Sequence, residues 1–297
     1  MKILIRVVIA LLVYLLLDFV GSEILLTGLD KGFGLNQQSK IFVVGHSHMM
    51  MGIDRYELEN GLHTKVSKYT RTGVSLPERY LMTGQYLRSG YADSLKVALV
   101  GVDCFTFVEG GISTNCYTLF YPFYGDSAVN HYLKDNAKPL EYWQHHIFRL
   151  SRYSDDLINS SFRGWMNDDK NYKTNEIDLD DFHKQRSKWK SDISFNPELM
   201  SLLNKMITEL NQKGVKVYLV NTPTLDEINR VDSAKFDSVM NYYRTLDQQN
   251  EMVDFLDFSH YEHDYSIFFD PLHLNVKGQK ILTDSLIEVL SKDSYLN

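Results

Sequence analysis

Five short apolar segments alternate with helical patterns along the chain, and this alternation restricts the possible folds more than any other feature. The segments cover about residues 41–44, 64–69, 96–102, 215–220 and 252–256. A short apolar run that ends at a turn residue is typical of a buried parallel strand, and residues 41–44 (IFVV) end at Gly45 in this way. Strands that alternate with helices form a parallel sheet with helices on both faces. The sequence therefore predicts an α/β fold on a five-stranded parallel sheet.

The helices are predicted at about residues 50–62, 77–89, 204–213 and 277–291. Pro77 suits the first turn of a helix, and Gly214 suits a carboxyl-terminal cap. Right-handed crossovers then give a doubly wound, flavodoxin-like layer, which binds ligands outside the carboxyl ends of its strands. The candidate site residues are therefore those that directly follow the strands, which are residues 45–48, Thr72, Gly73, Asp103, Asn221 and the segment after the fifth strand.

Residues 104–203 separate the third predicted strand from the fourth. They are rich in aromatic residues and histidine, as in the runs YPFYGD and EYWQHH. We expect a helical insertion that forms a cap over the active edge of the sheet and offers aromatic rings for stacking on sugars. The predicted domains are an N-terminal membrane anchor at residues 1–29 and one domain at residues 30–297 that contains the insertion.

The amino terminus carries an uninterrupted apolar run at residues 7–17, preceded by Lys2 and Arg6. A cleaved signal peptide and a single membrane span both fit such a run. Residues 19–22 (FVGS) are a poor cleavage site and the apolar character continues beyond them, which favours an uncleaved span from about residue 3 to about residue 26. The basic residues would then lie on the cytoplasmic side, and the domain on the extracytoplasmic, periplasmic side of the cell membrane.

Asp18 falls toward the outer end of this predicted span. A charge buried in a membrane is costly unless it is paired. The carboxylate therefore either reaches the membrane–water interface or contacts a second membrane protein, and the first interpretation is favoured.

Charge and cysteine content exclude several classes of protein. The 31 Lys and Arg residues against 38 Asp and Glu residues give a net charge of −7 and a pI near 5.8. A binder of DNA or RNA needs surplus positive charge to displace counterions from phosphates, so no nucleic-acid partner is expected. Two cysteines, Cys104 and Cys116, exclude a disulfide framework and a four-thiolate zinc site. They could form one disulfide or remain as two buried thiols.

Ser47 lies in the motif Gly45-His46-Ser47-His48, at the end of the first predicted strand. A serine on a sharp strand-to-helix turn presents its hydroxyl at the sheet edge, with its backbone N–H directed to the same side. This arrangement suits a nucleophile whose oxyanion is stabilised beside it. The alternative is that Ser47 only caps the next helix.

Near the carboxyl terminus, the run FFDPLHLN places Asp270 three residues before His273. At this spacing a carboxylate can orient an imidazole toward a serine, set its tautomer and stabilise the imidazolium. The alternative is that both residues only complete a turn. The combination of an early serine turn with a late D-x-x-H motif, just before the last helix, favours a catalytic site.

This combination resembles the SGNH (GDSL-like) serine hydrolases, over about residues 1–103 and 204–290. Residues 45–48, followed by residues 52–54 (GID), are closer to the branch that acylates envelope polymers. That branch includes the D-alanyl transfer protein of teichoic acids and the alginate-acetylation proteins. Its members are typically tethered by an N-terminal membrane helix and often work beside a membrane-bound O-acyltransferase.

The resemblance implies roles for four residues. Ser47 would be the nucleophile, His273 the general base and acid, and Asp270 its orienting carboxylate. Gly73 would match the glycine that lends a backbone N–H to the oxyanion hole. The implied protein is a membrane-anchored, extracytoplasmic enzyme that moves an acyl group, acetyl in the favoured case, through an ester on Ser47.

The acyl acceptor would be a hydroxyl of an envelope polysaccharide for a transferase, or water for an esterase. Two alternatives remain open. One is a non-catalytic adaptor that keeps the SGNH fold and holds a membrane-bound O-acyltransferase. The other is an envelope lipase or thioesterase.

Two positions depart from the family pattern. His46 replaces the aspartate of the GDS motif, and Asp103 stands where an asparagine of the third block is expected. An ionised Asp103 cannot donate to an oxyanion, so a loop or cap carboxylate is the favoured interpretation. Asn221 is the alternative donor, although an ordinary turn asparagine fits equally well.

His46 and His48 flank Ser47 and could, with carboxylates, bind zinc. The sequence contains no H-E-x-x-H motif and no cysteine cluster that would support such a site. We therefore expect the two histidines to line the catalytic turn, and we expect neither a metal nor a cofactor.

Overall fold

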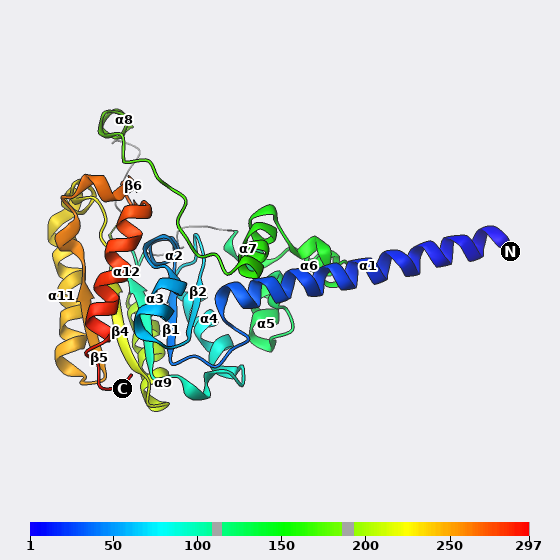
Figure 1. Ribbon diagram of the computed structural model, residues 1–297, viewed down its shortest axis with the longest axis horizontal. Helices are drawn as coiled ribbons and strands as arrows, with labels where there is room; N and C mark the ends of the chain where they lie inside the picture. The colour runs from blue at the N-terminus through cyan, green and yellow to red at the C-terminus, as the bar shows by residue number, and fades with distance from the viewer. Residues whose placement is uncertain (109–114, 186–192, 297) are drawn as a thin grey trace. The chain divides into compact units, whose positions relative to one another are not determined.

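The computed structural model describes residues 1–108, 115–185 and 193–296, which form two compact units (Figure 1). The helical unit contains Met1–Phe33 and Thr114–Asp168, and the sheet unit contains Gly34–Ser113 and Asp169–Asn297. This division differs from the predicted domains, because part of the insertion forms one unit with the N-terminal helix. Two stretches of the insertion, 109–114 and 186–192, lie outside the described residues, and its role as a cap over the sheet stays a prediction.

The sheet unit is built on five parallel strands in the order β2-β1-β3-β4-β5. This confirms the predicted doubly wound α/β fold, since the order places the chain's first strand inside the sheet and its crossovers on both sides. The strands are β1 (Ile41–Gly45), β2 (Val66–Thr70), β3 (Val97–Val102), β4 (Lys216–Asn221) and β5 (Val253–Asp257).

Helices cover both faces of this sheet. The helices of the sheet unit are α2 (Ser47–Gly52), α3 (Arg55–Leu62), α4 (Leu76–Arg88), α8 (Leu179–Gln185), α9 (Pro197–Gln212), α10 (Asp226–Asn229), α11 (Ser233–Gln249) and α12 (Val276–Leu290), of which the short helices α8 and α10 do not lie on the sheet. Short 3₁₀ helices lie between them, at η1 (Ala92–Ser94), η5 (Arg230–Asp232), η6 (Ser259–Tyr261) and η7 (Tyr265–Ile267).

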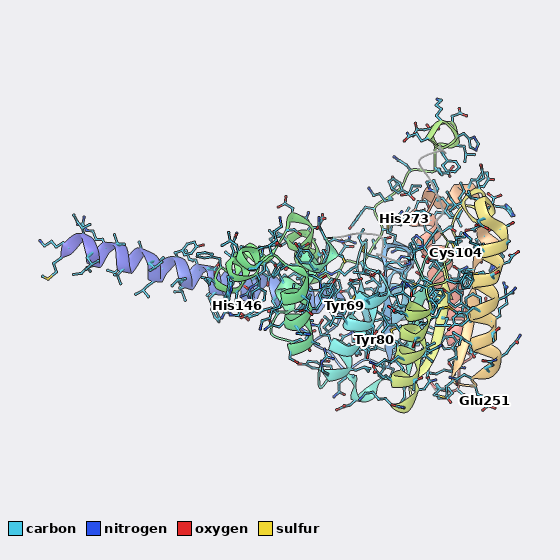
Figure 2. All side chains as sticks on the ribbon, turned by 180° about the vertical axis from the view of Figure 1, so that it is seen from behind. Tyr69, Tyr80, Cys104, His146, Glu251 and His273 are labelled. Carbon is cyan, nitrogen blue, oxygen red and sulfur yellow. The ribbon has the colours of Figure 1, made fainter. Side chains whose placement is uncertain are left out.

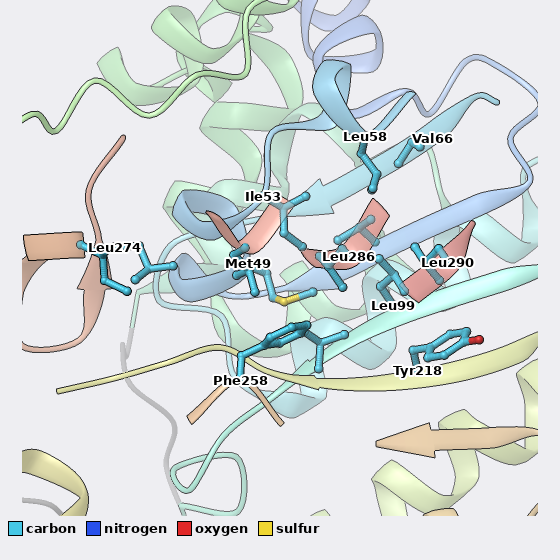
Figure 3. Packing of buried hydrophobic residues seen from close by; sticks show 14 of the residues in the cluster. Met49, Ile53, Leu58, Val66, Leu99, Tyr218, Phe258, Leu274, Leu286 and Leu290 are labelled. Atoms are coloured by element: carbon cyan, nitrogen blue, oxygen red, sulfur yellow. The ribbon is translucent and has the colours of Figure 1, made fainter. Parts of the chain in front are cut away.

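Alternate residues of β1 point to opposite faces of the sheet, because side chains alternate along a strand. Phe42 stacks on Tyr86 of α4, with 4.4 Å between the ring centroids. Ile41 and Val43 belong instead to a buried apolar cluster that includes Leu286 of α12 (Figure 3). The helices α4 and α12 therefore cover opposite faces, and the sheet is buried between them.

The predicted helix at residues 50–62 is interrupted. The Asp54 side chain accepts hydrogen bonds from the backbone N–H groups of Tyr56 and Glu57, and it caps α3. Aspartate is favoured at the start of a helix because it satisfies these otherwise unpaired donors, so α2 ends and α3 begins around it. A second difference is a short antiparallel pair, β6 (Phe268–Asp270) and β7 (His273–Leu274), which is too short to show an alternating sequence pattern.

The helical unit consists of one long helix and several short ones. They are α1 (Lys2–Phe33), η2 (Cys116–Phe123), α5 (Ser127–Asn136), α6 (Pro139–Ile147), η3 (Leu150–Arg152) and α7 (Asp155–Met166). The apolar part of α1 is long enough to cross a membrane, a test that an N-terminal signal sequence also passes. Cys104 and Cys116 are buried free thiols in different units.

Small residues bring α1 and α7 into close contact. A Cβ atom on Gly164 would lie 1.8 Å from the carbonyl oxygen of Gly28, and one on Gly28 would lie 2.5 Å from the carbonyl oxygen of Ser161. Small residues allow two helix backbones to approach in this way, as in pairs of membrane helices. The second half of α1 is therefore packed within the helical unit, whereas the side chains of its first half are exposed (Figure 2).

Asp18 lies in the packed part of α1 and is buried. Its carboxylate accepts hydrogen bonds from the backbone N–H groups of Arg149, at 2.8 Å, and Leu150, at 2.9 Å. The partner of Asp18 thus comes from the same chain. The sequence analysis did not predict this pairing within the chain, and the position of Asp18 relative to a membrane–water interface stays a prediction.

Candidate active site

The Ser47 turn joins β1 directly to α2 at the carboxyl edge of the sheet. His46, not Ser47, is the N-cap of α2, and its Nδ1 accepts a hydrogen bond from the backbone N–H of His48 at 3.2 Å. The alternative in which Ser47 caps the helix was therefore wrong. Two glycines let α2 start this close to the sheet, because a Cβ on Gly45 or Gly101 would lie 2.4 Å from the Cγ atom of Met49.

Asp270 and His273 face each other across the β6–β7 pair. One carboxylate oxygen of Asp270 accepts hydrogen bonds from the backbone N–H groups of Leu272 and His273, each at 2.9 Å. The Nδ1 atom of His273 lies 2.9 Å from both carboxylate oxygens. His273 thus contacts the Asp270 carboxylate twice. Its backbone N–H closes the turn, and its imidazole is oriented by the same carboxylate.

Ser47 and His273 meet although 226 positions separate them, with 2.8 Å between Ser47 Oγ and His273 Nε2. Because Nδ1 faces the Asp270 carboxylate, its hydrogen is donated there and the lone pair of Nε2 is left for the serine hydroxyl. Burial raises the pKa of Asp270, but the hydrogen bonds and charge of His273 and two backbone N–H groups lower it to below its ordinary value. The carboxylate therefore stays ionised at neutral pH.

The other predicted site residues lie in loops at the carboxyl ends of the strands. Gly73 follows β2 and has a φ of +76°, a conformation that glycine adopts without the steric cost of a Cβ atom. Asn221 ends β4, and its amide donates to an Asp257 carboxylate oxygen at 2.9 Å. This contact ties the end of β4 to the end of β5, so the structure gives the Asn221 amide a structural partner. The oxyanion roles of both residues stay predictions.

Asp103 pairs with the histidine that precedes Ser47, a contact the sequence analysis missed. One of its carboxylate oxygens lies 2.8 Å from His46 Nε2 and 3.4 Å from His48 Nδ1. The other accepts hydrogen bonds from the backbone N–H of Phe105 and the hydroxyl of Thr106. The prediction that Asp103 caps a loop is therefore right for the carboxylate oxygen that binds Phe105 and Thr106, and incomplete for the oxygen that faces the histidines. The strand order could have predicted this contact. Because β1 and β3 are neighbouring parallel strands, the residues just beyond their carboxyl ends lie side by side.

The pKa of Asp103 lies well below its ordinary range. Burial raises the pKa of this carboxyl, but the imidazoles of His46 and His48 and the nearby Arg79 guanidinium lower it by a larger amount. Arg79 is itself buried and donates to the carbonyl oxygen of Gly101 at 2.5 Å. An ionised Asp103 thus holds the His46 side of the Ser47 turn in place.

His46, His48 and Asp103 also offer three atoms, all within 4.8 Å of one another, that could act as metal ligands. A metal-bound histidine normally carries its hydrogen on the nitrogen that faces away from the metal, where it donates to an acceptor. The Nδ1 atom of His46 instead accepts a hydrogen bond from the backbone N–H of His48, which argues against its Nε2 as a metal ligand. The facing atoms His46 Nε2, His48 Nδ1 and Asp103 Oδ2 are nevertheless buried without a well-aligned hydrogen bond, so the expectation of no metal stays a prediction.

Burial lowers the pKa of His48 well below 6.5, and His46 lowers it further against the opposing effect of Asp103. The folded protein keeps His48 neutral, whereas the unfolded chain protonates it below about pH 6.5. The unfolded state then binds more protons, so the free energy of unfolding falls with falling pH by up to about 1.4 kcal/mol per pH unit. We expect His48→Gln to flatten this slope in denaturant unfolding of the full chain in detergent, between about pH 7 and pH 5.

A matched control for this prediction is His131→Gln, because it removes a histidine whose side chain is 80% exposed instead of a buried one. Equal slopes for the wild-type protein and His48→Gln would contradict a buried neutral imidazole.

Comparison with known proteins adds little to this description. No family model matches the sequence, and no curated protein matches it. Among solved structures, the chain is similar to a proposed platelet activating factor from Streptococcus pneumonia. The two chains are 12% identical with a TM-score of 0.42, over 96% of this chain and 98% of the other. A likeness at this level identifies neither a family nor an activity, so the function has to be argued from the site.

Proposed function

We propose that this protein is an SGNH-type serine enzyme that carries an acyl group on Ser47. The observation that supports this most directly is the unbroken series of contacts from the serine hydroxyl through His273 to Asp270, at 2.8 Å and 2.9 Å. A hydroxyl in contact with the free nitrogen of an imidazole, itself oriented by a carboxylate, is the arrangement of an activated nucleophile.

The reaction follows from these contacts. Ser47 Oγ forms a bond to the carbonyl carbon of the acyl donor while His273 Nε2 takes the hydroxyl proton. The bond from that carbon to the donor's leaving oxygen then breaks, and His273 returns the proton to this oxygen. In the second half, an acceptor hydroxyl gives its proton to His273 Nε2 while its oxygen forms a bond to the acyl carbon. The bond from that carbon to Ser47 Oγ then breaks, and His273 returns the proton to Oγ, which regenerates both residues. Asp270 remains ionised throughout and stabilises the imidazolium.

The proposed acceptor is a hydroxyl of an envelope polysaccharide and the proposed acyl group is acetyl, with water as acceptor if the enzyme is an esterase. The resemblance of residues 45–48 and of the D-x-x-H motif to the envelope branch supports this choice. A membrane anchor supports it as well. We propose that α1 is retained, because its cleavage would strip Gly28 and Asp18 from their partners in the helical unit.

Covalent labelling tests the proposed chemistry. A fluorophosphonate probe added to the full chain in detergent is expected to modify Ser47, identified by mass spectrometry of the labelled peptide. The label should be lost in Ser47→Ala and slowed in His273→Gln, because the serine is then no longer activated. Acetyl transfer from p-nitrophenyl acetate to an added polysaccharide, measured beside hydrolysis, separates a transferase from an esterase. A probe that never reacts with Ser47 would overturn the proposal.

A second candidate is a non-catalytic adaptor that holds a membrane-bound O-acyltransferase. It is favoured by the carboxylate of Asp103, which contacts His46 and, being ionised, has no hydrogen to donate to an oxyanion. An adaptor predicts that Ser47→Ala leaves both the acyltransferase partner and cellular polysaccharide acylation unchanged. An enzyme predicts that acylation is lost while the partner still co-purifies.

A further inference from the structure

The helix α6 presents an apolar face to its surroundings. Leu140, Trp143 and Ile147 recur at helical spacing and are 82%, 56% and 57% exposed. Large apolar side chains gathered on one exposed face are a mark of an interaction site, since isolated ones are ordinary but groups are not. We call these three residues the α6 face.

The opposite side of α6 is firmly held within the helical unit. Tyr142 is buried, and its hydroxyl donates to Asn130 of α5 at 2.6 Å. The Glu141 carboxylate accepts from the Tyr117 hydroxyl at 3.0 Å, and the His145 ring contacts Ser151 at 2.9 Å. The α6 face is therefore a fixed surface and not a loosely attached segment.

The segment that follows α6 lies against the apolar part of α1 (Figure 1). The rings of Phe148 and Tyr14 are 6.3 Å apart, and the Arg149 guanidinium lies 4.5 Å from the centre of the Phe19 ring. The hydrogen bonds from Arg149 and Leu150 to Asp18 fix the same contact. The apolar surface of α1 and the α6 face are thus adjacent parts of one unit.

The depth of this contact follows from helix geometry. With Lys2 and Arg6 both on the inner side, roughly 30 Å of hydrocarbon ends about 20 residues beyond Arg6, near residue 26. Asp18 and Phe19 then lie about 10–12 Å below the outer boundary of the hydrocarbon, at 1.5 Å per residue. An amphipathic helix that lies in a membrane interface buries its apolar face about 5–10 Å deep. The α6 face is therefore at the level where lipid would cover it.

The buried Asp18 is consistent with this position. Polar groups at membrane depth must find partners within the protein, and Asp18 has two backbone donors there. Tryptophan is also enriched at membrane interfaces, and Trp165 of α7 donates to the carbonyl oxygen of Ile24, close to the same boundary, at 3.1 Å.

We propose that α6 lies in the plane of the outer membrane–water interface, with Leu140, Trp143 and Ile147 inserted among the lipids. The protein would then be attached to the membrane by two helices, with α1 crossing the bilayer and α6 lying in the plane of its outer interface. This inference rests on the proposed retention of α1 as an anchor and not on the proposed chemistry at Ser47. We choose lipid as the partner of the α6 face because this face adjoins the apolar surface of α1, the proposed membrane anchor, in the same unit.

The test uses the full chain, reconstituted into phosphatidylcholine–phosphatidylglycerol vesicles that contain lipids brominated near the glycerol end of the acyl chains. Trp165→Phe and Trp189→Phe leave Trp143 as the single tryptophan, which is excited selectively at the red edge of its absorption where tyrosine does not absorb. We expect most of the Trp143 emission to be lost in brominated vesicles, and less to be lost when the bromines sit near the chain ends. Leu140→Asp combined with Ile147→Asp should restore the emission, whereas Tyr172→Asp, at an exposed aromatic residue of the sheet unit, should not.

Flotation on a density gradient separates the possible failures. Protein that floats with the vesicles but keeps its Trp143 emission would overturn the interfacial position of α6 alone. Protein that does not float would overturn the anchor and the interfacial helix together, and Ser47 labelling would still report on the chemistry.

Discussion

Ser47→Ala is expected to lower the rate of p-nitrophenyl acetate hydrolysis by about 10³- to 10⁶-fold, the range seen when the nucleophile of a serine enzyme is removed. The reason is structural, because the hydroxyl lies 2.8 Å from His273 Nε2 and alanine leaves that nitrogen with no proton to take. The measurement is kcat for the full chain in detergent, with thermal unfolding of the same sample to show that the fold is intact.

Ser238→Ala provides the matched control for this measurement. Ser238 lies exposed on α11 and its hydroxyl donates only within that helix, to Ala234, so its removal leaves kcat unchanged. A Ser47→Ala protein that hydrolyses the ester at the wild-type rate would exclude a covalent role for this serine and favour the adaptor.

Asp270→Asn is expected to lower kcat by about 10⁴-fold, the cost of the equivalent change in a Ser-His-Asp site. An asparagine amide can donate to His273 Nδ1, which moves the ring hydrogen to Nε2 and removes the acceptor for the Ser47 hydroxyl. The substitution keeps an oxygen for the backbone N–H groups of Leu272 and His273, so the turn should survive. The measurement is again kcat at neutral pH, where the native carboxylate is ionised because its pKa is lowered.

Asp264→Asn controls for the loss of a carboxylate in the same segment. Asp264 accepts from the backbone N–H and hydroxyl of Ser266 and caps η7, so its change should affect local stability and not the rate. If Asp270→Asn hydrolysed the ester as fast as the wild-type protein, then the orientation of His273 would not depend on this carboxylate.

The positions of the predicted strands and helices show which boundaries local sequence is sufficient to predict. Each of the five strands lies within two residues of its predicted position, because a run of apolar residues bounded by turn residues can be buried in few other ways. The break between α2 and α3 was missed although Asp54 is a strong helix start, since an apolar pattern that continues through a cap conceals it.

For the candidate site too, the sequence could identify some of the residues but not the contacts between them. Ser47, Asp270 and His273 could be chosen from the sequence because each lies in a short motif whose spacing carries a chemical meaning. Their contact, by contrast, needs the β6–β7 pair and the crossover of β1 next to β3, which no local pattern contains. The pairing of Asp103 with His46 is of this second kind.

Sequence alone determined the order of the five strands, the apolar amino-terminal helix and the residue types able to do acyl chemistry, because these depend on neighbours within a few positions along the chain. It did not place the helix α11 (Ser233–Gln249) between β4 and β5. Only the tertiary structure decided which distant groups meet. It placed Asp18 on the backbone of Arg149 and Leu150, used Asn221 to hold Asp257, and joined part of the insertion to α1. Such contacts form when packing brings together chain segments whose separation in sequence carries no information about their distance in space.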